Sequence, residues 1–347
     1  MPKHVTQPRI RVSGRSVLRA ITTTLATAAV ITTGTAWALA APTPLLTPIA
    51  APTGAHPVGR IDTELASPTR ELMVSVWYPA AGTGPAARYV PAGGPLNRAR
   101  IAAISAQWLH TPGAAVRMTA ANTVATEGAP VAGDRLPVVI LSPGLACPRF
   151  ILSGLASDLA SRGYVAVVMD HVGESPAVEF PDGEMAFGVA PSTDGAYMRG
   201  RLRARISDTR LTLDRLPDLP TVGPHLDLTR VAVAGHSYGG TTAVHTMAVD
   251  GRVAAAIMID SPAGWTDAVT PVAADRPVLS LQLSTPWPAE WARQYDAEHI
   301  QIVGAGHYSA TDMCAFDAGE DLCGTLGADQ AAQQTRTVIA DWLDHNL

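Results

Sequence analysis

The sequence of 347 residues is poor in lysine, cysteine and aromatic side chains. Lys3 is its single lysine, no run of basic residues occurs, and the formal net charge is −5. Nucleic acid is therefore excluded as an expected partner, because nucleic-acid-binding proteins need clustered positive charge. With only 3 Cys the chain is no disulfide-dense mini-protein, and its 30 Gly and 28 Pro follow no collagen-like period.

Apolar residues, in contrast, are abundant. They make up 47% of the chain, whereas charged residues make up 16%. A chain of this composition is not intrinsically disordered, and it has ample material for a hydrophobic core.

The first 40 residues have the composition of a secretory signal peptide. They carry five basic residues and no acidic one, and the uncharged stretch from Ala20 ends in Ala38-Leu39-Ala40. Because Thr and Gly make this stretch a poor spanning helix, we expect residues 1–40 to be cleaved rather than kept as a membrane anchor. Cleavage takes the formal net charge from −5 to −10. The mature chain is then expected to be secreted, with no stable membrane span and no attraction to anionic membranes.

Two of the cysteines are close in sequence. Cys314 and Cys323 lie in a loop-like segment, and because export makes disulfides possible, we predict that they form a disulfide bond. Two free thiols are the alternative. Cys147 has no obvious His partner, so we interpret it as a small buried residue and not as a catalytic thiol.

The rest of the chain predicts an α/β fold. Residues 41–55 are rich in Pro, Ala and Thr and predict a flexible leader. In residues 56–347, apolar strand-like segments alternate with helix-like segments, which is typical of one domain with a mostly parallel central sheet and helices on both faces. Two stretches without period, 81–134 and 171–196, are predicted to be long loops that form pocket walls, the first with one helix near 101–109. Predicted strands cover 72–78, 136–141, 164–169, 231–234, 254–259, 277–283 and 300–303, and predicted helices cover 151–162, 197–216 and 329–346.

The strongest chemical signal is a G-x-S-x-G motif, Gly235-His236-Ser237-Tyr238-Gly239. A β-branched apolar run precedes it and a helix-like segment follows it. A sharp strand-to-helix turn holds its central residue in a strained conformation, and the flanking glycines leave room for it. The motif therefore predicts Ser237 as a nucleophile at the carboxyl edge of the sheet. An ordinary glycine-rich turn with a solvated serine is the alternative.

A serine nucleophile needs a base, which should come from a later loop at the same sheet edge. His307 meets this requirement, because it follows a strand-like segment and the turn Gly304-Ala305-Gly306. His299 lies at the wrong end of that strand. His171 lies at the right edge but precedes the serine, so we interpret it as a structural, hydrogen-bonding residue near the site.

The base in turn needs an acid that orients its imidazole ring. Asp260 follows the buried run 254–259, one strand after the nucleophile, and is the predicted acid. Glu290 and Asp296 are the alternatives, and a helix-cap or turn residue is the structural interpretation of Asp260.

Acyl transfer also needs donors for the oxyanion. The backbone N–H groups of Tyr238 and Leu145 are the predicted donors, the second from the loop that begins at Ser142-Pro143-Gly144. A plain turn is the alternative for this loop. We find no metal-ligand spacing and no phosphate-binding glycine motif, so the predicted mechanism uses no metal and no cofactor.

At these residues the chain resembles the platelet-activating factor acetylhydrolase-like branch of the α/β-hydrolases, and secreted bacterial lipases and polyester-cleaving enzymes look similar. The segments that carry the resemblance are HPVGRIDTELASPTRELMVSVWYPA, SPGLACPR, SDLASRGYVAVVMDH, GHSYGG, IMID and GAGH. The resemblance implies an α/β-hydrolase fold, the triad Ser237, Asp260 and His307, and the oxyanion donors Leu145 and Tyr238. The family often has His-Gly where this chain has Pro143-Gly144.

Together these features predict a secreted, monomeric serine esterase or lipase. Its partners would be small-molecule or lipid esters with short or oxidised acyl chains, cleaved through an acyl-enzyme. An acyltransferase with the same triad is the alternative enzyme. A non-catalytic envelope-binding protein of the same fold is the alternative from another class.

Overall fold

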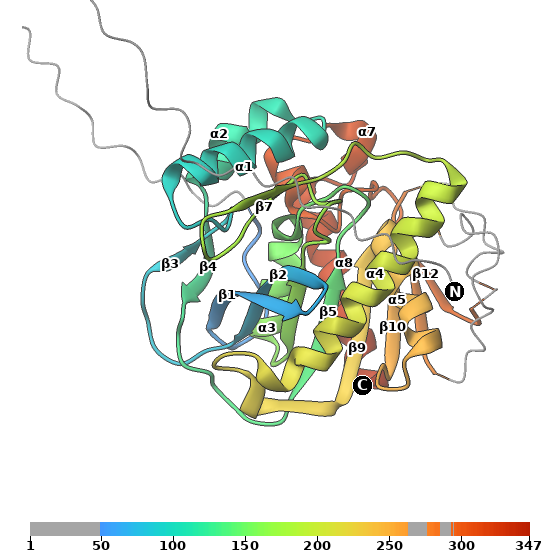
Figure 1. Cartoon of the computed structure of the whole chain (residues 1–347). Coiled ribbons are helices and arrows are strands. Elements are labelled where there is room, and N and C mark those ends of the chain that lie inside the picture. Colours follow the sequence, from blue (N-terminus) through green and yellow to red (C-terminus); the bar gives the residue numbers. More distant parts are fainter. Residues whose placement is uncertain (1–48, 263–275, 285–292, 294) are drawn as a thin grey trace, which may run out of the picture.

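The computed structural model describes residues 49–262, 276–284, 293 and 295–347 (Figure 1). The predicted signal peptide and Glu290 lie outside the described residues. The main sheet contains β1 (Val58–Ser67), β2 (Arg70–Pro79), β3 (Ala86–Arg88), β4 (Asn122–Glu127), β5 (Leu136–Ser142), β6 (Val165–Met169), β9 (Leu226–His236), β10 (Ala255–Ile259), β11 (Val278–Gln282) and β12 (Glu298–Gln301). The described helices are α1 (Pro95–Trp108), α2 (Ala115–Ala120), α3 (Ser153–Ser161), α4 (Gly195–Arg215), α5 (Tyr238–Val249), α7 (Glu320–Cys323) and α8 (Ala328–Asn346).

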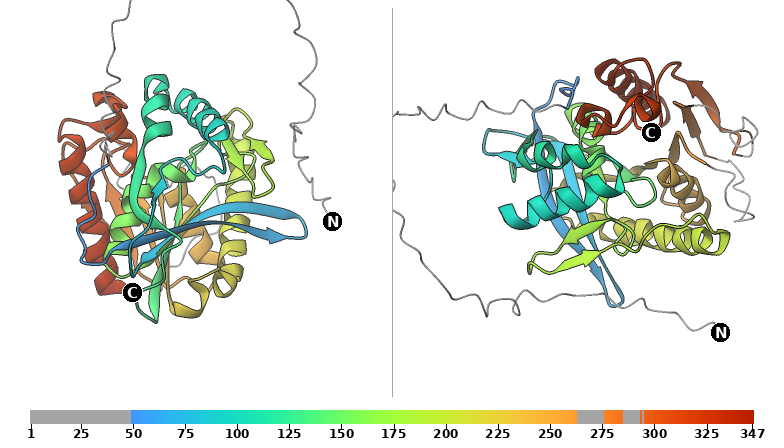
Figure 2. Two further views of the ribbon diagram at one scale, coloured as in Figure 1. Left: turned by 90° about the vertical axis from the view of Figure 1, so that its left-hand side faces the viewer. Right: turned by 90° about the horizontal axis from the view of Figure 1, so that it is seen from above.

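The strand order is β12-β11-β10-β9-β5-β6-β2-β1-β4-β3. Neighbouring strands from β6 to β12 are parallel, whereas β2 pairs with β6 and β1 in antiparallel fashion. Helices α3 and α8 cover one face of the sheet, and α4 and α5 cover the other (Figure 2). The predicted α/β fold with a mostly parallel sheet and helices on both faces is confirmed.

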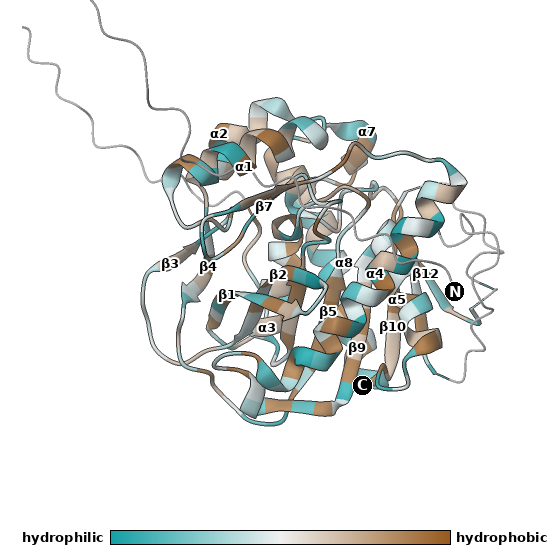
Figure 3. Ribbon diagram, in the orientation of Figure 1, coloured by the Kyte–Doolittle hydropathy of each residue, from teal (hydrophilic) through white to brown (hydrophobic). Residues whose placement is uncertain are grey.

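Burial on both faces explains why the central strands are continuous apolar runs. In β5, Val139 and Leu141 belong to one hydrophobic core, and Val138 and Ile140 belong to the core on the opposite face. The apolar colouring runs along the central strands (Figure 3). The six strands from β12 to β6 form five parallel pairs, so their carboxyl ends meet at one edge of the sheet, which is where the candidate site lies.

Residues 81–134 are more regular than the predicted loop. Helix α1 begins at Pro95, and β3 and β4 extend the main sheet. In β4 the inward positions hold Thr123 and Ala125, while Val124 faces outward, so the usual apolar alternation is hidden. Helix α1 corresponds to the helix predicted near 101–109, whereas β3, α2 and β4 were not predicted, so most of this stretch is more regular than expected.

The stretch 171–196 also differs in part from its prediction. It contains β7 (Ala177–Glu179) and β8 (Met185–Phe187), which pair with each other in a small antiparallel sheet. Strands of three residues are too short to give a recognisable period. Strand β1 was also not predicted from the sequence; its residues Val58 to Ser67 pair with β2.

The described part of the predicted leader, residues 49–55, is held against the domain. Both the N–H and the hydroxyl of Thr53 donate to Asp158 on α3, at 2.7 and 2.9 Å. Arg336 on α8 donates to the carbonyl of Ala50 at 2.9 Å. These contacts differ from the flexible segment that the composition predicted.

Cys314 and Cys323 form a disulfide bond, with sulfur atoms 2.15 Å apart. The bonded segment supports the chain beside His307. The N–H of Gly306 donates to the carbonyl of Cys323 at 3.1 Å, and the N–H of Tyr308 donates to that of Leu322 at 2.7 Å. Among the described residues, no helix combines the length and the apolar character needed to cross a bilayer.

Candidate active site

Ser237 lies in the turn between β9 and α5, with φ 53° and ψ −126°. A positive φ is strained for a residue with a side chain, and such strain is typical of functional turns. The neighbouring glycines make the turn possible. A Cβ atom at Gly239 would lie 1.9 Å from the carbonyl oxygen of Ser142, and one at Gly235 would lie 2.2 Å from the carbonyl carbon of Gly239. The turn therefore has the geometry that the motif predicted.

Asp260 follows β10 and is fully buried, with its carboxylate directed toward the end of β11. Its Oδ1 accepts from the N–H groups of Leu283 and Ser284 at 2.9 and 3.0 Å, and its Oδ2 accepts from the Ser284 hydroxyl at 2.6 Å. Burial alone would raise the pKa of Asp260, but hydrogen bonds from His307 and Ser284 outweigh burial and lower it. The side chain therefore carries a negative charge.

His307 contacts this carboxylate directly. Its Nδ1 lies 2.6 Å from Oδ2 of Asp260, and 24% of its side chain is exposed. Because an ionised carboxylate can only accept, Nδ1 carries a proton. In the neutral ring, Nε2 is then the nitrogen with a free lone pair, which is the state a general base needs.

His236 holds the His307 loop next to the Ser237 turn. Its Nε2 donates to the backbone carbonyl of His307 at 2.7 Å, and the two imidazole rings lie 4.6 Å apart. Burial, together with the charge of His307, lowers the pKa of His236 to about 3, so this ring stays neutral. The residue before Ser237 thus links the predicted nucleophile to the predicted base.

The predicted oxyanion donors flank Ser237. Tyr238 is the first residue of α5, and the first N–H groups of a helix have no partner within the helix. On the other side, a Cβ atom at Gly144 would lie 3.3 Å from Cβ of Ser237, so the Pro143–Leu145 loop packs against the serine. Cys147, at the end of this loop, is buried, which raises the pKa of its thiol to about 12 and keeps it protonated.

Of the two alternatives for the acid, only Asp296 lies among the described residues. Asp296 is exposed, and Glu290 lies outside the described residues. His299 lies in the edge strand β12. His171 is buried and hydrogen-bonds Ser142, as expected of a structural residue. No group of three or more potential metal ligands occurs within the ranges that the structure describes.

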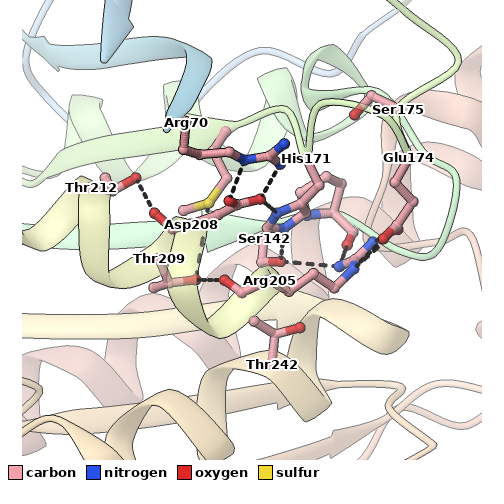
Figure 4. Close-up of polar contacts among 12 residues, drawn as sticks. Arg70, Ser142, His171, Glu174, Ser175, Arg205, Asp208, Thr209, Thr212 and Thr242 are labelled. Atoms are coloured by element: carbon pink, nitrogen blue, oxygen red, sulfur yellow. Dashed lines mark hydrogen bonds and ion pairs between the residues drawn. The ribbon is translucent and has the colours of Figure 1, made fainter. Parts of the chain in front are cut away.

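Sequence reasoning missed a buried charged network next to the site. It contains Arg205, Glu174, Asp208 and Arg70 around Ser142 and His171 (Figure 4). Nothing in the sequence distinguishes Arg205 from the other arginines of α4, since charged helix residues are ordinarily solvated.

Comparisons with known proteins agree with this architecture. The family model for platelet-activating factor acetylhydrolase, isoform II, matches residues 46–182 and 205–282, which include Ser237 and Asp260. The chain belongs to this family. Among curated proteins, the chain is similar to a "probable 1-alkyl-2-acetylglycerophosphocholine esterase" of Arthroderma benhamiae. The two are 32% identical over 135 residues, and the match covers 39% of this chain and 33% of that protein.

It is also 26% identical over 154 residues to a platelet-activating factor acetylhydrolase of Cavia porcellus, covering 37% of this chain and 35% of that protein. The chain thus matches about a third of the length of these curated acetylhydrolases.

Solved structures extend the likeness beyond the acetylhydrolase match. A ferulic acid esterase from Streptomyces cinnamoneus is 32% identical, with a TM-score of 0.71, and the match covers 86% of this chain and 92% of that structure. A dienelactone hydrolase-like promiscuous phosphotriesterase from metagenomic libraries is 13% identical, with a TM-score of 0.52, over 84% of this chain and 99% of that structure. The second likeness concerns the fold alone.

Proposed function

We propose that this chain is a secreted serine hydrolase that cleaves carboxylic esters through the triad Ser237, His307 and Asp260. The observation that carries the proposal is the pairing of His307 Nδ1 with the buried Asp260 carboxylate beside a strained serine turn. A buried carboxylate that orients an imidazole ring, next to a serine with positive φ, is the arrangement that acyl-transfer chemistry requires.

The proposed reaction has two halves. His307 Nε2 takes the proton of the Ser237 hydroxyl while Oγ attacks the ester carbonyl carbon, and the N–H groups of Leu145 and Tyr238 stabilise the oxyanion. The tetrahedral intermediate collapses to an acyl-enzyme as His307 protonates the departing alcohol. Water then attacks the acyl carbon and gives a proton to His307, and His307 passes this proton to Oγ of Ser237 as the acid leaves.

The relatives suggest which esters to test. The curated relatives are named for platelet-activating factor or acetylglycerophosphocholine, and the similar solved structure is named for ferulic acid esters. The shared chemistry is a carboxylic ester bond. Secretion is supported by the basic and apolar N-terminal 40 residues, and the N-terminal sequence of the exported protein would test it.

The deciding experiment is hydrolysis of p-nitrophenyl esters from acetyl to palmitoyl by the mature chain and by Ser237→Ala, with methyl ferulate and an acetylated glycerophosphocholine alongside. We expect activity in the wild type and none in the variant, and the profile over the esters would define the substrate class. A fluorophosphonate should label the wild type at Ser237. An unlabelled, inactive wild type would exclude the proposed function and favour a binding protein, whereas transfer products formed with an added alcohol would favour an acyltransferase.

A further inference from the structure

Arg205 contacts the loop that carries the predicted oxyanion donor Leu145. Although the other arginines of α4 are exposed or half-buried, Arg205 is only 1% exposed. One guanidinium nitrogen donates to the carbonyl of Pro143, and the other to the carbonyl of Gly144, both at 2.8 Å. The first nitrogen also donates to the Ser142 hydroxyl at 3.2 Å. The planar fork of arginine thus binds consecutive groups of one loop.

The bond to Gly144 sets the direction of the next N–H group. In a planar trans peptide the C=O of one residue and the N–H of the following residue point in opposite directions. Since the Gly144 carbonyl points at Arg205, the N–H of Leu145 points away from it. In the described part of the chain this N–H has no hydrogen-bond acceptor, and Gly144 itself lies against Ser237. The Leu145 N–H therefore has a defined direction and is available to a substrate oxygen.

Glu174 holds the guanidinium group in place from the other side. Its two carboxylate oxygens each accept from Arg205 Nε at 3.0 Å, and Oε1 also accepts from the N–H of Ala146 at 3.2 Å. Burial would raise the pKa of Glu174, but the charge and the hydrogen bonds of Arg205, together with the N–H of Ala146, outweigh burial and lower the pKa. The ion pair therefore contacts the loop on both sides of Leu145. Arg205 donates to the two carbonyl groups before Leu145, and Glu174 accepts from the N–H group after it.

A second set of contacts supports Ser142 at the base of the loop (Figure 4). The Ser142 hydroxyl lies 2.8 Å from His171 Nε2, and His171 Nδ1 lies 2.9 Å from Asp208. Burial, aided by the charge of Arg205, lowers the pKa of His171, so the ring is neutral. Its Nδ1–H donates to Asp208, its Nε2 accepts from Ser142, and the Ser142 oxygen accepts from Arg205. Each hydrogen bond in this series thus joins one donor to one acceptor.

We propose that Arg205 is a positioning residue that presents the Leu145 N–H to the oxyanion. The proposal rests on the proposed ester hydrolysis and adds a residue that would not touch the substrate. Arg205 also lies over the ring of Tyr238, 5.3 Å from its centre, so it contacts both residues whose N–H groups are assigned to the oxyanion. Its role is distinct from that of a purely structural ion pair, because the carbonyl contacts govern the orientation of one peptide group.

The test compares Arg205→Lys and Arg205→Met with Arg203→Met, a matched control at an exposed position of the same helix. Active sites are first titrated with a fluorophosphonate, so that kcat is expressed per competent enzyme. Removing one oxyanion donor costs about 100- to 1000-fold in kcat, so a misdirected donor should cost roughly 10- to 100-fold in Arg205→Met, with a smaller loss in Arg205→Lys. KM for p-nitrophenyl acetate should change little, and Arg203→Met should match the wild type.

A tetrahedral inhibitor separates positioning from stability. Inhibition by an alkylboronic acid, whose adduct places an oxygen in the oxyanion site, should weaken by the same factor as kcat/KM. A purely structural role would lower the melting temperature and the titrated fraction but leave kcat per site and boronate inhibition unchanged, and that result would overturn the proposal.

The remaining outcomes are also informative. If the wild type and Ser237→Ala are equally inactive, the proposed function and this inference both fail. If the wild type is active and titrated Arg205→Met equals it, only the inference fails. Should the Arg205 variants not fold, a crystal structure of the phosphonylated wild type decides. We expect a phosphonyl oxygen within hydrogen-bond distance of Leu145 N while Gly144 O remains on Arg205, and a reversed Gly144–Leu145 peptide would overturn the inference.

Discussion

His307 Nδ1 lies 2.6 Å from Oδ2 of Asp260, although the two residues come from different strand ends and are 47 positions apart. The same carboxylate accepts three further hydrogen bonds from Leu283 and Ser284. Its position is therefore determined by the end of β11 as well as by His307. Asp260 follows β10 with a positive φ of 46°, and its carboxylate contacts residues that follow β11, the next strand in the chain.

Asp260→Asn should preserve the fold but lower kcat by about 10⁴-fold, because an amide favours the wrong imidazole tautomer. The measurement is kcat on p-nitrophenyl acetate together with the circular dichroism spectrum. Asp296→Asn is the matched control, since Asp296 also has a positive φ, of 48°, and is exposed. Equal activity of Asp260→Asn and the wild type would show that another group orients His307.

Gly239→Ala should destroy activity and lower the melting temperature strongly, because its Cβ would lie 1.9 Å from the Ser142 carbonyl oxygen. The control is Gly200→Ala in α4, where a Cβ would meet nothing within 4 Å. Replacing a helical glycine by alanine stabilises a helix by about 1 kcal/mol, so this control should melt at a slightly higher temperature. Thermal denaturation of both variants checks the pair, and a normal melting curve for Gly239→Ala would contradict the described turn.

Replacing both Cys314 and Cys323 by Ser should lower the free energy of unfolding by about 2–3 kcal/mol, the value expected for a short closed loop. Because the bonded segment hydrogen-bonds the chain on either side of His307, we expect turnover to fall as well. Urea unfolding and kcat, measured with and without reductant, check both effects. A reductant effect in the double-serine variant would point to another cause.

Asp312 should make stability depend on pH. Burial raises its pKa to about 7, against the charge of Arg336. The folded protein then binds a proton that the unfolded chain releases, so the contribution of Asp312 to stability is greatest at acidic pH and decreases as pH rises from about 4 to about 7. Between pH 5 and pH 8 the wild type should lose on the order of 2–3 kcal/mol relative to Asp312→Asn. Urea unfolding at the two pH values measures this loss, with exposed Asp182→Asn as control, and parallel pH profiles for the wild type and Asp312→Asn would refute it.

The sequence was sufficient to predict an element of the structure where its local pattern agrees with its tertiary surroundings. The apolar run from Val138 to Leu141 predicts a strand buried on both faces, and the glycines around Ser237 predict the turn. Sequence-based prediction failed where a feature depends on contacts between residues far apart in the chain. The pairing of β1 with β2 and the burial of Arg205 depend on which elements meet in space. An arginine on a helix is ordinarily solvated, so its residue type predicts an exposed position for Arg205.

The position of the disulfide-bonded segment late in the chain has a consequence for biosynthesis. Ser237 leaves the ribosome well before His307, and the backbone groups that hold His307 in place, at Leu322 and Cys323, emerge later still. A nascent chain therefore contains the proposed nucleophile before the segment that holds the proposed base in place. If export precedes oxidation of Cys314 and Cys323, the hydrolase would mature fully only after it has left the cytoplasm, where the producing cell's own esters are out of its reach.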